Sequence, residues 1–519
     1  MPSTFWGLNI ATSGLNAAQI ALNTTSHNVA NAQTKGYSRQ ETNAAAADAL
    51  RVHQRYGMLG SGVQVTAINR IRDSYYDNKY WRNNAGEGQY ETKHYYMEQV
   101  QLQFNEFGVS KTGFSTVYNN FFNAIDELSN YPSEVNYRNV VLQYGGALTE
   151  YFSSISTNLQ SLQKECNNEI KNMTDRINSY ATGIASINEQ IKTLEMYGGN
   201  ANDLKDSRDV LVDELSKLVS INITEVESDT GSSSYRIKIN GQILVDGEDY
   251  NELTVVSRTE AGRRNQEDMQ GLYTVRWKSG VSFDMYYADL SGELRGYVDM
   301  RDGNDNGATL TGDRGVSYKG IPYYMNQINT WVKKFAYELN KIHIKGEDLD
   351  GNAAEPFFTL KNMTLDEQRA AAAAEGISLP DYIRNNMTAD NCQVNPSIYT
   401  NPYKLATTMK VSEGVDGQDL IKEFVGLRAK KIFVSGGAED CFQGMISSMA
   451  INTSDAESME TSFQKIGKAI VNQRLSISGV DEDEEATNLV KYQNAYELSA
   501  KALSVMSEIL DKLINGTAV

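Results

Sequence analysis

The chain has 519 residues, 40% apolar and 22% charged, so it is long enough for several hydrophobic cores and too apolar to be disordered. Its formal net charge of -18 at pH 7 repels phosphate groups and argues against a nucleic-acid partner. The three cysteines form neither a disulfide framework nor a zinc-ligand spacing, and no apolar run is long enough to span a membrane.

The first thirty residues carry a seven-residue repeat, typical of a helix that pairs with another helix. No Lys, Arg, Asp or Glu precedes Lys35, and the surface between the repeats is Asn, Gln, Thr and Ser, which form helix poorly. Gly14 costs about 1 kcal/mol more relative to Ala, so we expect a helix of marginal stability on its own. The predicted seam is Leu8, Ala11, Leu15, Ala18, Leu22, Thr25 and Val29.

The stretch SHNVANAQTKGYSRQ, residues 26–40, predicts a specific end to this helix. Asn28 and Asn31 have short amides that bond free backbone groups, and Gly36 suits the left-handed conformation that ends a helix. Tyr37 is expected to fold back onto the seam, and His27 to pack rather than act as a base. An ordinary helix stop followed by a loop is the plainer alternative.

Farther along, the sequence predicts an unusually long helix. Apolar residues recur at helical spacing from Val141 to Leu194, which corresponds to about 80 Å of helix. Its end is predicted at YGGN, residues 197–200, and a shorter helix with leucines over 204–218 is expected to turn back against it. This length predicts a rod or bundle, to which a helix over residues 442–470 is expected to return.

Residues 222–430 are predicted mostly as β structure. Alternating apolar residues over 235–239 and 243–245 flank Asn240-Gly241, a pair typical of a two-residue hairpin turn. Two more strands are expected, and a helix with Trp331, Phe335, Leu339 and Ile342 is expected to pack on the sheet. These two strands are Tyr273, Val275 and Trp277, and Val281, Phe283 and Met285.

The sequence contains few motifs for catalysis or metal binding. Nucleotide-loop, zinc-protease and paired-cysteine motifs do not occur, and the four histidines, His27, His53, His94 and His343, lie far apart. Residues 302–313, DGNDNGATLTGD, match a calcium-binding loop only in part, and a solvated turn is the favoured interpretation.

The last forty residues predict a second helix with its own seam, after an acidic start, DEDEEATN, that suits a helix N-terminus. Burying four large apolar residues of the first helix gives roughly 6 to 12 kcal/mol, against roughly 25 kcal/mol for ordering its backbone. We therefore expect both termini to gain order when neighbouring copies add contacts. The second seam is Leu489, Tyr492, Tyr496, Ser499, Leu503, Met506, Leu510 and Leu513.

Residues 13–40 resemble the N-terminal motif of the bacterial flagellar axial proteins, the family of rod, hook and hook-associated proteins. Residues 478–514 resemble the matching C-terminal motif of the hook-filament junction members of this family, as do segments at 202–225, 292–303 and 346–358. A hook protein would continue into strands after the first motif, whereas this chain is expected to continue into long helices. Residues 364–391, with an alanine run, have no counterpart in the resemblance.

The expected fold is mainly α with an inserted β-rich (α+β) domain, arranged as discontinuous nested domains. Three units are expected: a terminal coiled-coil assembly domain, a long antiparallel helical bundle, and the β-rich insert with a small helical, alanine-rich insertion near 360–395. Their boundaries are 1–64 plus 478–519, 65–221 plus 431–477, and 222–430.

The resemblance implies a structural protein, not an enzyme, that polymerises at the junction between hook and filament through its terminal helices. No cofactor, metal or catalytic residue is expected. A hook-like axial protein, or an exported adhesin that uses the central β domain, is the alternative. The expected assembly interface is Leu8, Ala11, Leu15, Ala18, Leu22, Asn28, Val29, Asn31, Gly36, Tyr37, Leu489, Tyr492, Tyr496, Leu503, Met506, Leu510 and Leu513.

The resemblance also implies the partners: further copies of the chain in a ring-like junction, the hook protein and hook-associated protein 3. A cytoplasmic export chaperone is expected to cover the C-terminal helix at Leu503, Met506, Leu510 and Leu513. The protein is expected to leave the cytoplasm unfolded through the flagellar type III system, without a separate secretory signal, and to reside in the extracellular flagellum. Neither nucleic acid nor membrane insertion is expected.

Overall fold

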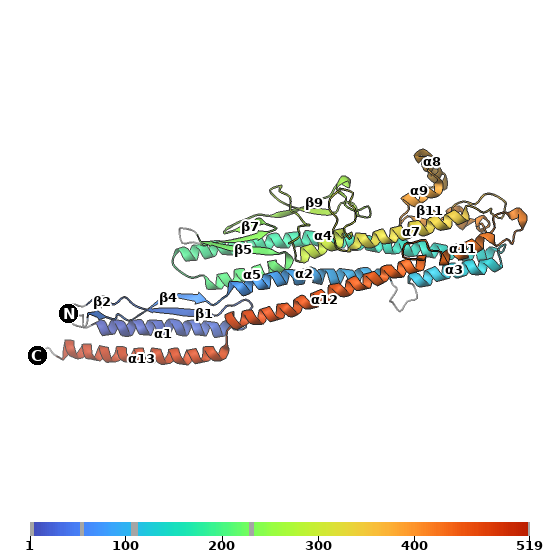
Figure 1. Cartoon of the computed structure of the whole chain (residues 1–519). Helices are drawn as coiled ribbons and strands as arrows, with labels where there is room; N and C mark the ends of the chain where they lie inside the picture. Colours follow the sequence, from blue (N-terminus) through green and yellow to red (C-terminus); the bar gives the residue numbers. More distant parts are fainter. Residues whose placement is uncertain (1–4, 52–56, 105–112, 228–232, 517–519) are drawn as a thin grey trace.

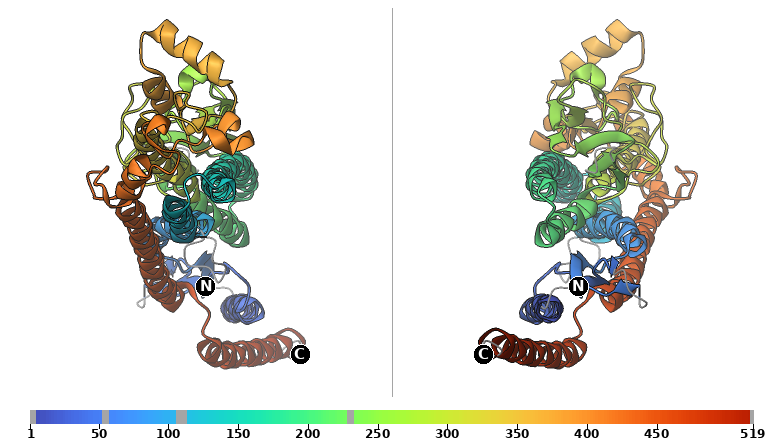
Figure 2. Two further views of the ribbon diagram at one scale, coloured as in Figure 1. Left: turned by 90° about the vertical axis from the view of Figure 1, so that its right-hand side faces the viewer. Right: turned by 90° about the vertical axis from the view of Figure 1, so that its left-hand side faces the viewer.

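The computed structural model describes residues 5–51, 57–104, 113–227 and 233–516. The molecule is elongated and mainly helical, with small separate sheets, and both termini lie at one end (Figure 1). Seen along its length, the helices within residues 74–218 and 438–478, which together we call the shaft, lie beneath a layer of strands and loops (Figure 2). Within the described ranges, no helix is both long and apolar enough to cross a membrane.

The predicted long helix is confirmed as α4, Val135–Met196, which has 62 residues. Its apolar positions are buried along most of its length, and it ends beside Gly198, whose φ is +81°. The shorter helix α5, Asn202–Leu218, turns back against α4 as expected. The returning helix α12, Ala438–Ser478, runs along α2, Ser74–Gln103.

The chain does not pass directly from the N-terminal motif into long helices, so that expectation is wrong. Strand β1, Gln40–Ala46, pairs antiparallel with β4, Val63–Arg70, before α2 begins. The short strands β2, Leu50–Arg51, and β3, Met58–Leu59, extend this hairpin. Val63, Val65 and Ala67 alternate with polar residues in β4, which suits a half-buried strand.

The predicted hairpin is confirmed, with Asn240 and Gly241 at φ +53° and +76° in its turn. One detail of the alternation is wrong, because the register shifts at Ile237/Lys238 and both Leu244 and Val245 are buried instead of alternating. The sheet contains four antiparallel strands in chain order. They are β5, Ile221–Glu227; β6, Ser233–Ile239; β7, Gln242–Asp246; and β8, Asp249–Tyr250.

Of the two further predicted strands, one is confirmed and one is wrong. Strand β10, Tyr273–Trp277, pairs antiparallel with β9, Leu253–Ser257. Residues 281–285 form only one isolated bridge, at Ser282. The backbone reverses at Gly280, and the Asp284 side chain accepts a hydrogen bond from the Tyr286 backbone N–H, so a turn replaces the strand.

The helix α7, Ile321–His343, packs in the helical core rather than on the four-stranded sheet, which corrects that prediction. The Trp331 ring lies 4.9 Å from Phe152 of α4, and its indole N–H donates to the Ala438 carbonyl at 2.8 Å. Aromatic side chains bury large areas and pair favourably with one another, and α4 and α12 supply Phe152 and Phe442 beside Trp331.

The prediction that residues 222–430 are mostly β is also wrong, because helices occupy much of this range. Strands β11 and β12 form a small hairpin that carries α8 and α9, the alanine-rich insertion, which projects from the molecule (Figure 2). The remaining elements are α3, Phe114–Asn130; α6, Glu293–Asp302; β11, Phe358–Leu360; α8, Leu365–Glu375; α9, Leu379–Asn386; β12, Cys392–Val394; α10, Pro396–Thr400; α11, Asp419–Ala429; and the 3-10 turns Glu260–Gly262, Pro402–Lys404 and Val411–Glu413.

His343 lies fully buried at the end of α7 and joins two backbone segments. Its Nδ1 lies 2.5 Å from the Glu355 carbonyl oxygen, and its Nε2 accepts from the Ala406 N–H at 3.0 Å. The neutral ring satisfies both contacts, whereas a protonated Nε2 would face another donor. Burial accordingly lowers the pKa of His343 to about 4.

We expect the free energy of unfolding to fall as the pH drops from about 6.5 to about 4, because the unfolded His343 takes up a proton first. The loss from this group is about 3 kcal/mol. Urea unfolding at a series of pH values measures it. The variant His343→Gln should be less stable at neutral pH and show a flatter profile in this window; an unchanged profile would contradict the assignment.

Candidate assembly interface

The N- and C-terminal helices lie side by side and antiparallel, apart from the shaft (Figures 1 and 2). They are α1, Trp6–Asn31, and α13, Glu482–Asn515. A Cβ added to Gly7 would lie 2.9 Å from the Met506 side chain, and one added to Gly14 would lie 3.1 Å from Ser499 Oγ. The seven-residue step from Gly7 to Gly14 therefore matches a seven-residue step back along α13, from Met506 to Ser499.

The residues of α1 that face α13 are smaller than the sequence predicts. Ala11 and Ala18 are buried as expected, but Leu8, Leu15 and Leu22 are only half-buried. Glycine allows the helices to approach closely, and the leucines consequently lie along one side of the contact. The predicted seam is thus corrected by one residue: the line facing α13 begins with Gly7 and Gly14.

A second face of α1 packs on the β1–β4 hairpin. The Trp6 indole donates to the Gly60 carbonyl at 3.1 Å, and the Val63 N–H donates to Ser13 Oγ at 3.2 Å. Farther along, Thr42 Oγ lies 3.1 Å from Thr24 Oγ. Two faces of α1 are therefore occupied within the molecule, which leaves the leucine side for other contacts.

Helix α13 is packed much less closely, and Glu485 is its one buried residue among those described. Of the predicted seam, Leu489, Tyr492, Tyr496, Leu503 and Leu510 are half-buried, while Met506 and Leu513 remain 38% and 48% exposed. Its opposite side carries an apolar stripe that the sequence interpretation missed. This outer stripe consists of Val490, Leu498, Val505 and Ile509, all exposed.

The predicted helix-ending motif forms a buried polar joint. The Asn28 side chain, 1% exposed, bonds both backbone groups of Gln40 at 2.9 Å, in the manner of a neighbouring strand. Tyr37 folds back as expected, and its hydroxyl donates to Asn28 Oδ1 at 2.8 Å. Asn31 donates to the His27 carbonyl, whereas Val29 is exposed and contributes little to the joint.

Arg39 ties this joint to the start of α13. Its guanidinium contacts Glu484 at 2.9 Å and Glu485 at 2.7 Å, and Glu485 also accepts from Asn28 at 3.3 Å. The Arg39 backbone N–H donates to the Ser478 carbonyl at the end of α12. Both terminal helices are thereby fixed to the shaft at one point.

A cluster of buried charges continues the joint into the shaft. Arg70 and Arg72 contact Asp209 of α5 at 2.6 Å and 3.0 Å, and Ser38 donates to Asp206. The arginines hold the pKa of Asp209 below its usual range, although burial alone would raise it. Asp206, Asp209 and Asp213 share one face of α5, a spacing that the sequence displays, but their partners lie far away along the chain.

Known protein families match the same regions of the chain. Residues 97–358, just over half of the chain, match the family described as "Flagellar hook-associated protein FlgK helical domain". The chain belongs to the FlgK family. Residues 8–37 match "Flagella basal body rod protein" and residues 471–516 match "Flagellar basal body rod FlgEFG protein C-terminal", which cover α1 and α13.

The FlgK relatives extend over the whole chain. Flagellar hook-associated protein 1 of Bacillus subtilis (strain 168) is 29% identical, over 100% of this chain and 99% of its own length. The proteins of that name from Salmonella typhimurium and Escherichia coli (strain K12) are 25% and 24% identical, each over 98% of this chain and 99% of theirs. A structure of the flagellar hook junction protein FlgK from Burkholderia pseudomallei matches with a TM-score of 0.43 at 21% identity, over 54% of this chain and 46% of that one.

Gly36 gives a test of the joint in this FlgK-family chain. Its φ is +82°, and an added Cβ would lie 2.2 Å from Val210 Cγ2 of α5. We expect Gly36→Val to lower the free energy of unfolding by about 1–3 kcal/mol and to impair assembly, because a β-branched residue disfavours this backbone conformation. Thermal unfolding of Gly36→Val, with and without Val210→Ala, separates the clash from the strain. Full rescue by Val210→Ala would contradict the role of the positive φ.

In the structure, the residues of the partial calcium-loop match are paired with other side chains. The Asp302 carboxylate lies between Arg258 and Arg301, Asn304 contacts Asn265, and Asp313 contacts Arg264. Among the described residues, no group of three or more His, Cys, Asp or Glu side chains is placed to hold a metal ion. His53 lies outside the described residues.

Proposed function

We propose that this protein is a structural, non-enzymatic subunit of the hook-filament junction that polymerises through α1 and α13. The single observation that carries this is the state of α13, which has one described buried residue and two apolar sides. Folded monomers rarely expose so long an apolar surface unless another protein covers it. Names of relatives, flagellar hook-associated protein 1, supply the flagellar setting.

In the proposed assembly, α1 and α13 form a coiled coil that neighbouring copies extend. A groove of about 780 Å3 runs between the two helices, lined by Leu8 and Thr12 of α1 and by Leu503 of α13. Leu15 and Leu22 follow Leu8 at seven-residue spacing and are also half-buried. A helix from an adjacent copy would bury the groove and these leucines together, which favours ordered packing over isolated contacts.

The domain division belongs to this proposal. We assign residues 1–64 with 478–519 to assembly, 65–221 with 431–477 to the shaft, and 222–430 to an insert. The Arg39 contacts with Glu484 and Glu485 support a boundary close to Ser478, where α12 ends. The α7 contacts show that the insert shares a core with the shaft, so it would not fold as a separate unit.

The proposed partners are the hook protein on one side and hook-associated protein 3 on the other, with export by the flagellar type III system. For the cytoplasmic chaperone, we propose the α13 residues Leu503, Met506, Leu510 and Leu513. Leu503 and Leu510 are half-buried beside α1, so a chaperone would cover all four only while α1 and α13 are apart. Chaperone binding before α1 and α13 pair fits a subunit that is exported unfolded.

Deletion of the gene in the source bacterium tests the function. We expect cells with hooks but without attached filaments, and filament protein released into the medium. The full chain should restore attachment, whereas a chain without residues 482–519 should not. Normal, attached filaments on cells that lack the protein would overturn the proposal.

A further inference from the structure

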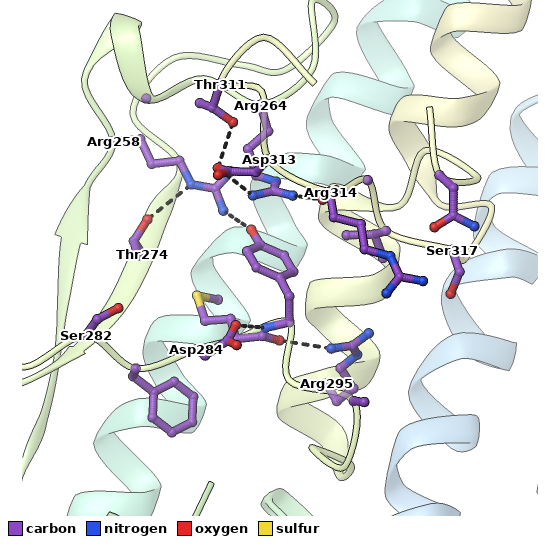
Figure 3. Close-up of a pocket in the computed structure, with 18 residues that line it drawn as sticks. Arg258, Arg264, Thr274, Ser282, Asp284, Arg295, Thr311, Asp313, Arg314 and Ser317 are labelled. Atoms are coloured by element: carbon purple, nitrogen blue, oxygen red, sulfur yellow. Dashed lines mark hydrogen bonds and ion pairs between the residues drawn. The ribbon is translucent and has the colours of Figure 1, made fainter. Parts of the chain in front are cut away.

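A cleft of about 730 Å3 opens beside the β9–β10 pair and is lined by four arginines (Figure 3). The arginines are Arg258, Arg264, Arg295 and Arg314, and the acidic residues in the lining are Asp284 and Asp313. Its volume lies in the range of about 300–1,000 Å3 that is usual for small-molecule sites. In a chain of net charge -18, this concentration of guanidinium groups is a local exception.

Two of the arginines are held in fixed positions. Arg258 contacts Asp302 at 2.8 Å and the Tyr286 hydroxyl at 2.9 Å. The Arg264 guanidinium stacks on the Tyr286 ring at 4.1 Å and donates to the Arg314 carbonyl at 2.6 Å. A ligand that binds here does not have to order these side chains, which removes an entropic cost of binding.

Some donors in the cleft have no partner. Arg264 is only 7% exposed, yet its Nε has no hydrogen-bond partner among the described residues. Arg314 is exposed, and its guanidinium makes no hydrogen bond or ion pair within the described part of the chain. The exposed Arg314 guanidinium can therefore pair with a group from outside the chain, whereas Arg264 Nε is enclosed and not itself open to the cleft.

The contacts of Asp313 indicate the chemistry of a group that this cleft would bind. The Asp313 carboxylate is 63% exposed and reaches Arg264 at 3.3 Å, with a second hydrogen bond from Thr311 at 2.8 Å. A free oxyanion would make the same contact to Arg264, and the exposed Arg314 side chain, which points away from Asp313 (Figure 3), would turn toward it. Guanidinium groups bind carboxylate and phosphate through paired, charge-assisted hydrogen bonds.

We propose that this cleft binds a small molecule bearing an oxyanion, a carboxylate or a phosphate, which displaces Asp313 from Arg264 and is held by Arg314. The site lies beside β9 in the insert, away from α1 and α13 (Figure 1). It is therefore independent of the proposed assembly, and either proposal can fail without the other.

Isothermal titration calorimetry of the full chain with inorganic phosphate, with glucuronate and with neutral glucose tests the proposal. We expect Arg314→Gln to weaken anion binding about tenfold, because one charge-assisted pair is lost. Asp313→Asn should tighten it about fivefold by removing the competing carboxylate. Whichever anion binds more tightly identifies the ligand class, and glucose should give no heat.

The matched control is Arg82→Gln, since Arg82 is an exposed arginine on α2 outside the cleft. It should leave the affinity unchanged. An equal loss of binding in Arg82→Gln and Arg314→Gln, or no binding of either anion to the wild type and Asp313→Asn, would overturn the proposal. Arg314 is exposed, so its replacement should leave the thermal unfolding midpoint unchanged and keep the comparison valid.

Discussion

We expect Leu498→Asp to abolish filament attachment while leaving the monomer as stable as before. Leu498 belongs to the outer stripe of α13 and is 68% exposed, so the folded monomer loses little when it is replaced. In an assembled junction, the same position would bury an unpaired carboxylate against apolar neighbours, at a cost of several kcal/mol for each contact. Repeated in every copy of a ring, this cost prevents incorporation.

The measurement combines complementation of the deletion strain, with filaments counted by electron microscopy, and thermal unfolding of the purified chain. Leu15→Asp and Leu22→Asp should behave alike on the leucine side of α1, with a small loss of stability because these residues are half-buried. The matched control is Ile451→Asp, which adds the same charge at an exposed apolar residue of α12, outside α1 and α13. Normal attachment with Leu498→Asp would show that the outer stripe is not an interface.

Periodicity alone predicts the long elements of this fold. Helices α4 and α13 have apolar repeats too long for a strand, and the Asn240-Gly241 turn specifies its hairpin through local backbone conformation. The motif over residues 26–40 is also predictable in outline. Gly36 has the expected positive φ, and Tyr37 returns to the helix as expected.

The missed features depend on partners that lie far away in the sequence. In α1, a seam through Gly7 and Gly14 and one through Leu8 and Leu15 have the same spacing, and only the approach of α13 selects the glycines. Similarly, Arg39 finds Glu485 through the folded chain, not through any local pattern. The strand β1, with sequence QETNAAA, has little alternation and becomes a strand because β4 supplies its hydrogen bonds.

The largest stability effect is expected for Asp302→Ala. Asp302 is 1% exposed and contacts Arg258 at 2.8 Å and Arg301 at 2.6 Å. Arg301 is itself fully buried, so removal of the carboxylate leaves two guanidinium groups without a counter-charge. Breaking such a buried pair costs about 3–5 kcal/mol, a large fraction of the stability of a typical domain.

The dependence on pH distinguishes this effect from loss of packing. Burial alone would raise the pKa of Asp302, but Arg258 and Arg301 hold it well below the usual value of 3.8. The native carboxylate therefore stabilises the fold above about pH 4, and this contribution is lost as the pH falls further. Urea unfolding should show this loss in the wild type and a weaker slope below pH 4 in Asp302→Ala. Asp313→Asn, which alters an exposed pair, should change stability by less than about 1 kcal/mol, and an equal effect of the two variants would contradict the buried-charge argument.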